Sequence, residues 1–328
     1  MNKQTLAIFA LIVSQIFWGA SYLMSDYALQ VFRPATLVSL RMIIAAIVLG
    51  AIGLATGQLQ RMHLRDFKFF LFASFCEPFV YFLCEAESLT RVSPTVASVV
   101  LSLIPLFTPV FAFIVLREKV TIMNICGIVI SLVGVMMIII NRQGRLDADI
   151  IGIVLLFVAM VSSITYTLML RKIPAEYNIL SIVFYMFCTS LLFFLPTALV
   201  RDYQSIVSID FSLPDTVNAI WMVVALSLSS SCIAFLFFSF GVRTLGPTRA
   251  NVFNNIQPGV TAVFAWILAL VTHTDPAMTI VKWLGIVVVI VGMFISQVDL
   301  KKKVKTFRRK TRIRQIRARR KSASSVNS

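Results

Sequence analysis

Ten long apolar stretches follow one another through most of this chain. About 20 apolar residues are what a helix needs to cross the hydrocarbon core of a bilayer. Hydrophobic residues make up 59% of the 328 residues and charged residues only 13%, too few polar groups to cover the surface of a soluble protein. We therefore expect an all-α integral membrane protein with ten transmembrane helices. This composition excludes cytosolic enzymes, secreted disulfide scaffolds and disordered proteins.

The expected spans fall into two sets of five. The first five are Thr5–Met24, Pro34–Ala55, Phe67–Ala86, Pro94–Leu116 and Thr121–Ile140. The second five are Ile151–Leu170, Asn178–Val200, Val217–Val242, Thr248–Val271 and Ala277–Val298. The first span is too long for a signal peptide and lacks a small-residue cleavage site, so we treat it as a helix.

The distribution of Lys and Arg predicts the orientation. With the N-terminus inside, ten basic residues fall in inner segments ahead of the tail and six in outer segments. An even number of spans returns the C-terminus to the same side. Because basic residues concentrate on the cytoplasmic side, we expect a multi-pass protein of the cell inner (plasma) membrane with both termini in the cytoplasm.

The net charge of +16 belongs mainly to a C-terminal tail. Residues 301–321 carry 13 basic side chains and no acid, which leaves 17 basic against 14 acidic residues elsewhere. We expect residues 299–328 to be disordered and to contact anionic lipids, which attract such clusters. The tail also favours the inside orientation. A basic tail could also bind nucleic acid, but we expect no nucleic-acid binding here.

The two sets of spans repeat each other. Pro94 and Pro105 are 11 residues apart, as are Pro247 and Pro258. Further matches join Val110-Phe-Ala-Phe113 to Val263-Phe-Ala-Trp266, and Gly127 and Gly134 to Gly285 and Gly292. We expect five-helix repeats over residues 1–145 and 146–298. An odd number of spans inverts the second copy, and inverted repeats are typical of secondary transporters. A non-transporting membrane scaffold or a lipid-interacting partner protein is the alternative.

Within this pattern the chain resembles the EamA family of the drug/metabolite transporter superfamily over residues 5–298. The residues that carry the resemblance are Trp18-Gly19, Arg41, the Pro94…Pro105 spacing, Leu116-Arg117-Glu118-Lys119-Val120-Thr121, Gly127 and Gly134. Arg117 replaces the glycine of the family's leucine-glycine-glutamate turn, and Pro276 stands where the second half would repeat Glu118. The resemblance implies export or exchange of a small metabolite or drug-like molecule through a ten-helix bundle.

Arg41, Glu77 and Glu85 fall well inside the expected spans, where ionisable groups are costly and mark candidate functional sites. The helical rise puts Arg41 roughly 10 Å below the outer end of its span, Glu77 near mid-membrane and Glu85 within about one turn of the outer surface. Two interpretations stay open. Arg41 forms a static ion pair with a glutamate, or a carboxylate, Glu77 first, exchanges a proton or contacts a cationic substrate group.

Polar and aromatic side chains predict a substrate cavity. Asn251, Asn254, Asn255 and Pro258 share one face of the ninth span, and repeat symmetry places Ser102 opposite that face. Tyr81 shares a helix face with Glu77 and Glu85. The substrate-binding candidates are Trp18, Tyr22, Tyr81, Ser102, Asn251, Asn254 and Asn255. The asparagines could instead bond to neighbouring helices, and we favour the cavity.

The remaining features favour structural roles. We expect Gly53-x-x-x-Gly57 and the serines at 227 and 229–231 to let helices pack closely. The five cysteines fall in apolar runs and are expected to fill the core. His63 and His273 lie in loops on opposite sides, and neither a phosphate-binding loop nor a zinc-protease motif is present. We therefore expect no metal, no cofactor and no enzyme, and either a monomer or a homodimer.

Overall fold

The computed structural model of the chain describes residues 2–116, 122–139, 149–169, 173, 176–246, 250–273 and 279–296. The regular structure in these ranges is helical throughout. The Glu118 block, most of the segment that separates the halves, and the basic tail lie outside the described residues. What the sequence predicts for them stays a prediction.

The described helices follow the predicted spans. Those of the first half are α1 (Lys3–Ala28), α2 (Pro34–Ala55), η1 (Leu64–Asp66), α3 (Phe67–Ser74), η2 (Phe75–Val80), α4 (Tyr81–Leu89), α5 (Pro94–Leu101), α6 (Ile104–Leu116) and α7 (Ile122–Ile139). Those of the second half are α8 (Ile150–Met169), α9 (Ile179–Arg201), α10 (Tyr203–Val207), α11 (Pro214–Leu226), η4 (Ser227–Ala234), α12 (Phe235–Leu245), η5 (Val252–Ile256), α14 (Gln257–Val271) and α15 (Ile280–Ser296).

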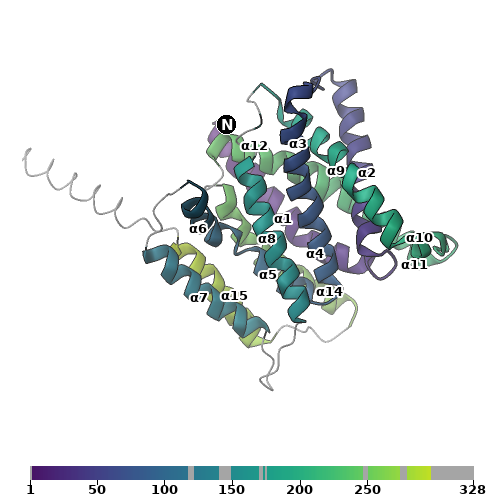
Figure 1. The fold of residues 1–328 in the computed structure, drawn as a ribbon. Helices are drawn as coiled ribbons and strands as arrows, with labels where there is room; N and C mark the ends of the chain where they lie inside the picture. Colours follow the sequence, from purple (N-terminus) through teal and green to yellow (C-terminus); the bar gives the residue numbers. More distant parts are fainter. Residues whose placement is uncertain are drawn as a thin grey trace, which may run out of the picture.

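Alone or joined end to end, the described helices form eight segments long and apolar enough to cross a membrane, and α7 and α15 each contain a shorter apolar helix. The predicted all-α membrane fold is confirmed, and these eight segments together with α7 and α15 agree with the ten spans expected. Large apolar side chains such as Ile47, Leu54 and Leu199 are exposed on the outside of the bundle, as expected where lipid replaces water as the solvent. Figure 1 shows α7 and α15 side by side at one edge of the bundle.

Helix starts follow local chemistry. Pro34, Pro94 and Pro214 each occupy the first turn of their helix, where a missing N–H costs nothing. Asn178 caps α9 by accepting a hydrogen bond from the backbone N–H of Ser181 at 2.8 Å. Gly57 has a φ of +63° just after α2 and no neighbour that a Cβ would meet. The expected packing role is therefore wrong for Gly57, which ends the helix, whereas Gly53 packs against Leu180.

Two equivalent pairs of spans are interrupted, and among these breaks only the one beside Pro78 has a local sequence signal that predicted a bend. The third and eighth spans contain the π-helical segments η2 and η4. The fourth span breaks between α5 and α6, and the ninth begins with the tighter turns of η5. Pro105 and Pro258 are each the second residue of the helix that follows the irregular segment. The repeated prolines thus mark where each helix starts again.

Helices α2 and α9, the second and seventh spans, connect the two halves. At one end the Asp202 carboxylate accepts hydrogen bonds from the N–H and hydroxyl of Thr36, at 2.8 and 3.0 Å. At the other end the backbone N–H of Gln60 donates to the Ser181 hydroxyl at 2.9 Å. Polar contacts at both ends therefore stabilise the packing of α2 against α9.

The cysteines only partly fill the core. Cys76 and Cys232 are buried, as predicted, and Cys84 and Cys188 are partly buried. The prediction is wrong for Cys126, which is exposed on α7. Hydropathy alone could not separate these cases, because lipid-facing and core-facing positions of a membrane helix are equally apolar.

Candidate functional site

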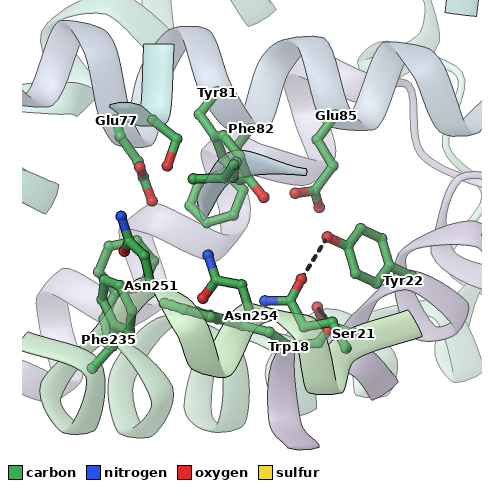
Figure 2. A pocket seen from close by; sticks show the side chains of 14 residues that line it. Trp18, Ser21, Tyr22, Glu77, Tyr81, Phe82, Glu85, Phe235, Asn251 and Asn254 are labelled. Carbon is green, nitrogen blue, oxygen red and sulfur yellow. Dashed lines mark hydrogen bonds between the residues drawn. The ribbon is translucent and has the colours of Figure 1, made fainter. Parts of the chain in front are cut away.

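A partly open pocket, with about 470 Å³ of free space that includes its open side, lies between the two halves. The first half lines it with Trp18, Ser21, Tyr22, Glu77, Tyr81, Phe82, Glu85 and Ile104. The second half lines it with Ser163, Phe235, Phe238, Asn251, Asn254 and Gln257. Figure 2 shows the two glutamates on one wall and the side chains of Asn251 and Asn254 on the opposite wall. Both halves of the chain therefore contribute side chains to the site.

Glu77 stands at a break in its helix. Its backbone is extended, with φ −144° and ψ 120°, the region into which a following proline pushes the residue before it. The side chain is 6% exposed. It interacts with Ser163 of α8, yet its Oε2 atom has no hydrogen-bond partner. Pro78 thus positions a buried carboxylate with one open acceptor atom.

Glu85 lies two helical turns further along the same wall and is 4% exposed. Its carboxylate interacts with the Tyr81 hydroxyl and is attracted by Arg41. Its surroundings therefore differ from those of Glu77, because a cation compensates the charge of Glu85 from outside the pocket.

Arg41 of α2 is 2% exposed and does not line the pocket. Its guanidinium carbon lies 4.6 Å from the centre of the Phe82 ring. One terminal nitrogen, Nη2, donates to the hydroxyls of Ser230 at 3.1 Å and Ser231 at 3.4 Å. Among the described residues, Arg41 has no carboxylate oxygen within 4.0 Å. Its hydrogen bonds go to the serines of η4, and Glu85 attracts it without direct contact, so the ion pair considered from the sequence stays a prediction.

The serines of the eighth span have two roles. Ser227 and Ser229 donate to carbonyl oxygens of their own helix, those of Val223 and Ala225, at 2.7 and 2.6 Å. Ser230 and Ser231 bind Arg41 instead. We predicted only a packing role for these two serines, because the sequence does not show which helix faces them.

A chain of hydrogen bonds ties α1 to α14 beside the pocket. The Tyr22 hydroxyl donates to Gln257 Oε1 at 3.3 Å (Figure 2), and Gln257 Nε2 donates to Gln15 Oε1 at 2.7 Å. The Thr261 hydroxyl donates to the carbonyl oxygen of Gly19 at 2.8 Å. Gln257 was not predicted, although it is a polar residue directly before the repeated Pro258.

Aromatic rings form the second component of the site. The Trp18 ring centre lies 4.9 Å from that of Phe238 and 5.5 Å from that of Phe235. The Trp18 Nε1–H donates to the carbonyl oxygen of Ser230 at 3.1 Å. Phe82, Phe235 and Phe238 were not predicted as lining residues, because aromatic residues in an apolar run give no signal of which face they occupy.

Only part of the predicted polar face of the ninth span lines the pocket. Asn251 and Asn254 line the pocket, and Asn251 Nδ2 and Asn254 Oδ1 are buried without partners. Asn255 is buried outside the pocket, with both amide atoms unpartnered. Ser102 is also outside, and its hydroxyl donates to the carbonyl oxygen of Val99 at 2.7 Å. Of the ten candidates, Ser102, Asn255 and Arg41 do not line the pocket, whereas Trp18, Tyr22, Glu77, Tyr81, Glu85, Asn251 and Asn254 do.

The described residues contain no group of three His, Cys, Asp or Glu side chains that could hold a metal ion. Together, the helical fold with its repeated halves and the pocket between them define the class, a multi-pass membrane permease. The chain belongs to the EamA-like transporter family, whose profile matches residues 5–140 and 150–297. As a permease it is not an enzyme.

Comparison with known proteins agrees with this family. The chain is 25% identical over 306 residues to the uncharacterized transporter YetK of Bacillus subtilis (strain 168), covering 92% of this chain and 89% of YetK. It is 24% identical to the uncharacterized transporter YcxC of the same organism, covering 93% and 96%. An uncharacterized transporter of Archaeoglobus fulgidus is 28% identical, covering 72% and 80%. A crystal structure matches with a TM-score of 0.63 and 16% identity, covering 89% of this chain and 96% of the other, which shows a shared fold.

Proposed function

We propose that this permease moves a small metabolite or drug-like molecule by alternating access, for export or exchange. The observation that carries the proposal is the pocket lined by both halves. A site shared between inverted repeats opens to one side or the other when the halves move relative to each other. The non-transporting scaffold is not favoured, because the pocket collects buried polar groups that face one another.

The pocket side chains have separate roles in this proposal. Trp18, Tyr22, Tyr81, Asn251 and Asn254 contact the substrate. Glu77 and Glu85 supply negative charge, and Arg41 balances Glu85 from behind Phe82. Asn255 and Ser102 lie outside the pocket, and we assign them to the interrupted regions of the ninth and fourth spans, where the helices would bend during transport.

The proposal places the protein in the inner membrane with both termini in the cytoplasm. Its support is the excess of Lys and Arg in the inner segments and in the tail. We further propose repeats over residues 1–145 and 146–298, lipid contact by the tail without nucleic-acid binding, and a monomer or homodimer. A periplasmic reporter fused after Ser328 that becomes active would contradict this orientation.

Transport itself is testable without knowledge of the substrate. Purified protein is reconstituted into liposomes loaded with a metabolite mixture, and mass spectrometry compares both compartments with protein-free liposomes. We expect at least one compound to redistribute only when the protein is present. Redistribution of none would support the scaffold instead.

A further inference from the structure

The charges of the pocket are unbalanced on the Glu77 side. Two carboxylates line the pocket, and none of its described lining residues is Lys, Arg or His. The nearby cation, Arg41, is attracted to Glu85 and hydrogen-bonded to Ser230 and Ser231. Glu77 therefore faces the cavity without a protein cation of its own.

The open atoms around Glu77 specify what could fill this position. Glu77 Oε2 and Asn254 Oδ1 are buried acceptors without donors, on opposite walls of the pocket. A buried polar atom without a partner carries a desolvation cost that a bound donor removes. Two unpartnered acceptors in one pocket favour a ligand group with several N–H donors.

The surrounding rings match a cation with an apolar body. Trp18, Phe235 and Phe238 line the same pocket as the two acceptors, and the Trp18 ring contacts both phenylalanine rings. Aromatic faces attract a cation and also bury apolar surface. An anionic group would instead meet two carboxylates, with no lining cation to offset the repulsion.

We infer that the pocket binds a protonated amine, with its ammonium group between Glu77 and Asn254 and its apolar part against Trp18, Phe235 and Phe238. Asn251, whose Nδ2 is unpartnered and points toward Glu77 in Figure 2, orients the carboxylate. This inference rests on the proposed function and names its substrate class. N–H groups are required, because the two open acceptors need hydrogen bonds as well as charge.

The direct test measures binding of four probes of similar shape to the full-length protein in detergent at neutral pH. Phenethylammonium is cationic with N–H donors, its trimethylated analogue is cationic without them, phenethyl alcohol is neutral, and hydrocinnamate is anionic. We expect phenethylammonium to bind at least about tenfold more tightly than each of the others, as one charge-assisted hydrogen bond supplies. Equal or tighter binding of the trimethylated analogue, the alcohol or hydrocinnamate, or binding of none of the four, would overturn the inference.

A matched pair of variants locates the binding atom. Glu77→Gln should remove the preference for phenethylammonium over phenethyl alcohol. Glu87→Gln is the same change on the same span, but Glu87 lies outside the pocket and pairs with Arg201 at 2.6 Å, so this variant should keep the preference. A folded Glu77→Gln protein that keeps the preference contradicts the inference. If this variant does not fold, the comparison of the four probes on the unaltered protein still decides.

These results separate the inference from the proposed function, because binding in detergent requires no transport. Amine binding by a protein that moves no metabolite in liposomes keeps the inference and refutes transport. Movement of anionic or neutral metabolites alone, with no amine binding, keeps transport and refutes the amine as substrate.

Discussion

A Cβ atom on Gly134 would come within 2.7 Å of the carbonyl oxygen of Gly285, because α7 and α15 pack backbone against backbone at this point. A Cβ on Gly292 would likewise come within 2.8 Å of the carbonyl oxygen of Gly127. The repeat aligns Gly127 with Gly285 and Gly134 with Gly292. If a two-fold axis relates the two helices, the contact of Gly134 with Gly285 must recur as a contact of Gly292 with Gly127. Both contacts are present.

The glycine contact predicts a specific sensitivity. Gly134→Ala should push α7 away from α15 and lower the free energy of unfolding by about 2 kcal/mol, the usual cost of overpacking. Thermal unfolding in detergent measures this effect. Gly259→Ala on α14 is the control, because a Cβ there would meet nothing within 4 Å. Equal losses in both variants would argue against the close packing of α7 and α15.

Arg41 and Glu85 should be energetically coupled. In a double-mutant cycle of Arg41→Met and Glu85→Gln, we expect a coupling of about 1 kcal/mol, in the range typical of neighbouring residues. The attraction joins Arg41 to Glu85, so the cycle with Glu77→Gln should give a smaller coupling. Denaturation of the three single and two double variants provides both values. A larger coupling with Glu77 would contradict the arrangement described here.

Asp149 should make stability depend on pH. It caps α8 by accepting from the N–H of Ile151 at 2.8 Å, and Arg91 donates to its other oxygen at 2.9 Å. These contacts lower the pKa of Asp149. The stabilisation is therefore complete above its unfolded-state pKa of about 4 and is lost as the pH falls through the lower folded-state pKa.

Two replacements of Asp149 separate the cap from the charge. Asp149→Asn retains a capping oxygen, so its melting temperature near neutral pH should fall less than that of Asp149→Ala. Both variants should lose the part of the acid dependence that Asp149 contributes. An unaltered acid dependence in Asp149→Asn would show that this carboxylate adds nothing to it.

Much of the fold could be predicted because a bilayer imposes a simple rule on the sequence. Each span must be long and apolar, and the repeated prolines and glycines are local signals that a single chain displays twice. The interruptions were harder to predict, because π-helical and 3₁₀ turns preserve the apolar character of a span. Pro78 is the one residue in these interruptions whose type predicts a bend, and the structure has an extended backbone at Glu77 directly before it.

The site could be predicted only in part. Depth in the membrane follows from residue counts, so Glu77, Glu85 and the asparagines were identifiable as polar groups within spans. The direction in which a side chain points depends on how ten helices pack, and the sequence does not give it. For this reason the partners of Arg41 were missed, as were Gln257 and the phenylalanines of α12.

The most direct test of the account is flux through the pocket in a variant that keeps the fold. Asn254→Leu removes an open acceptor from the pocket wall and fills part of the cavity with an apolar side chain. Asn218→Leu is the same change at an exposed position of α11. Both proteins are reconstituted at equal amounts, and the compound identified in the metabolite screen is followed over time. We predict that Asn254→Leu loses most of the flux at unchanged thermal stability, whereas Asn218→Leu transports normally. Full flux through Asn254→Leu would contradict the assignment of this pocket as the transport site.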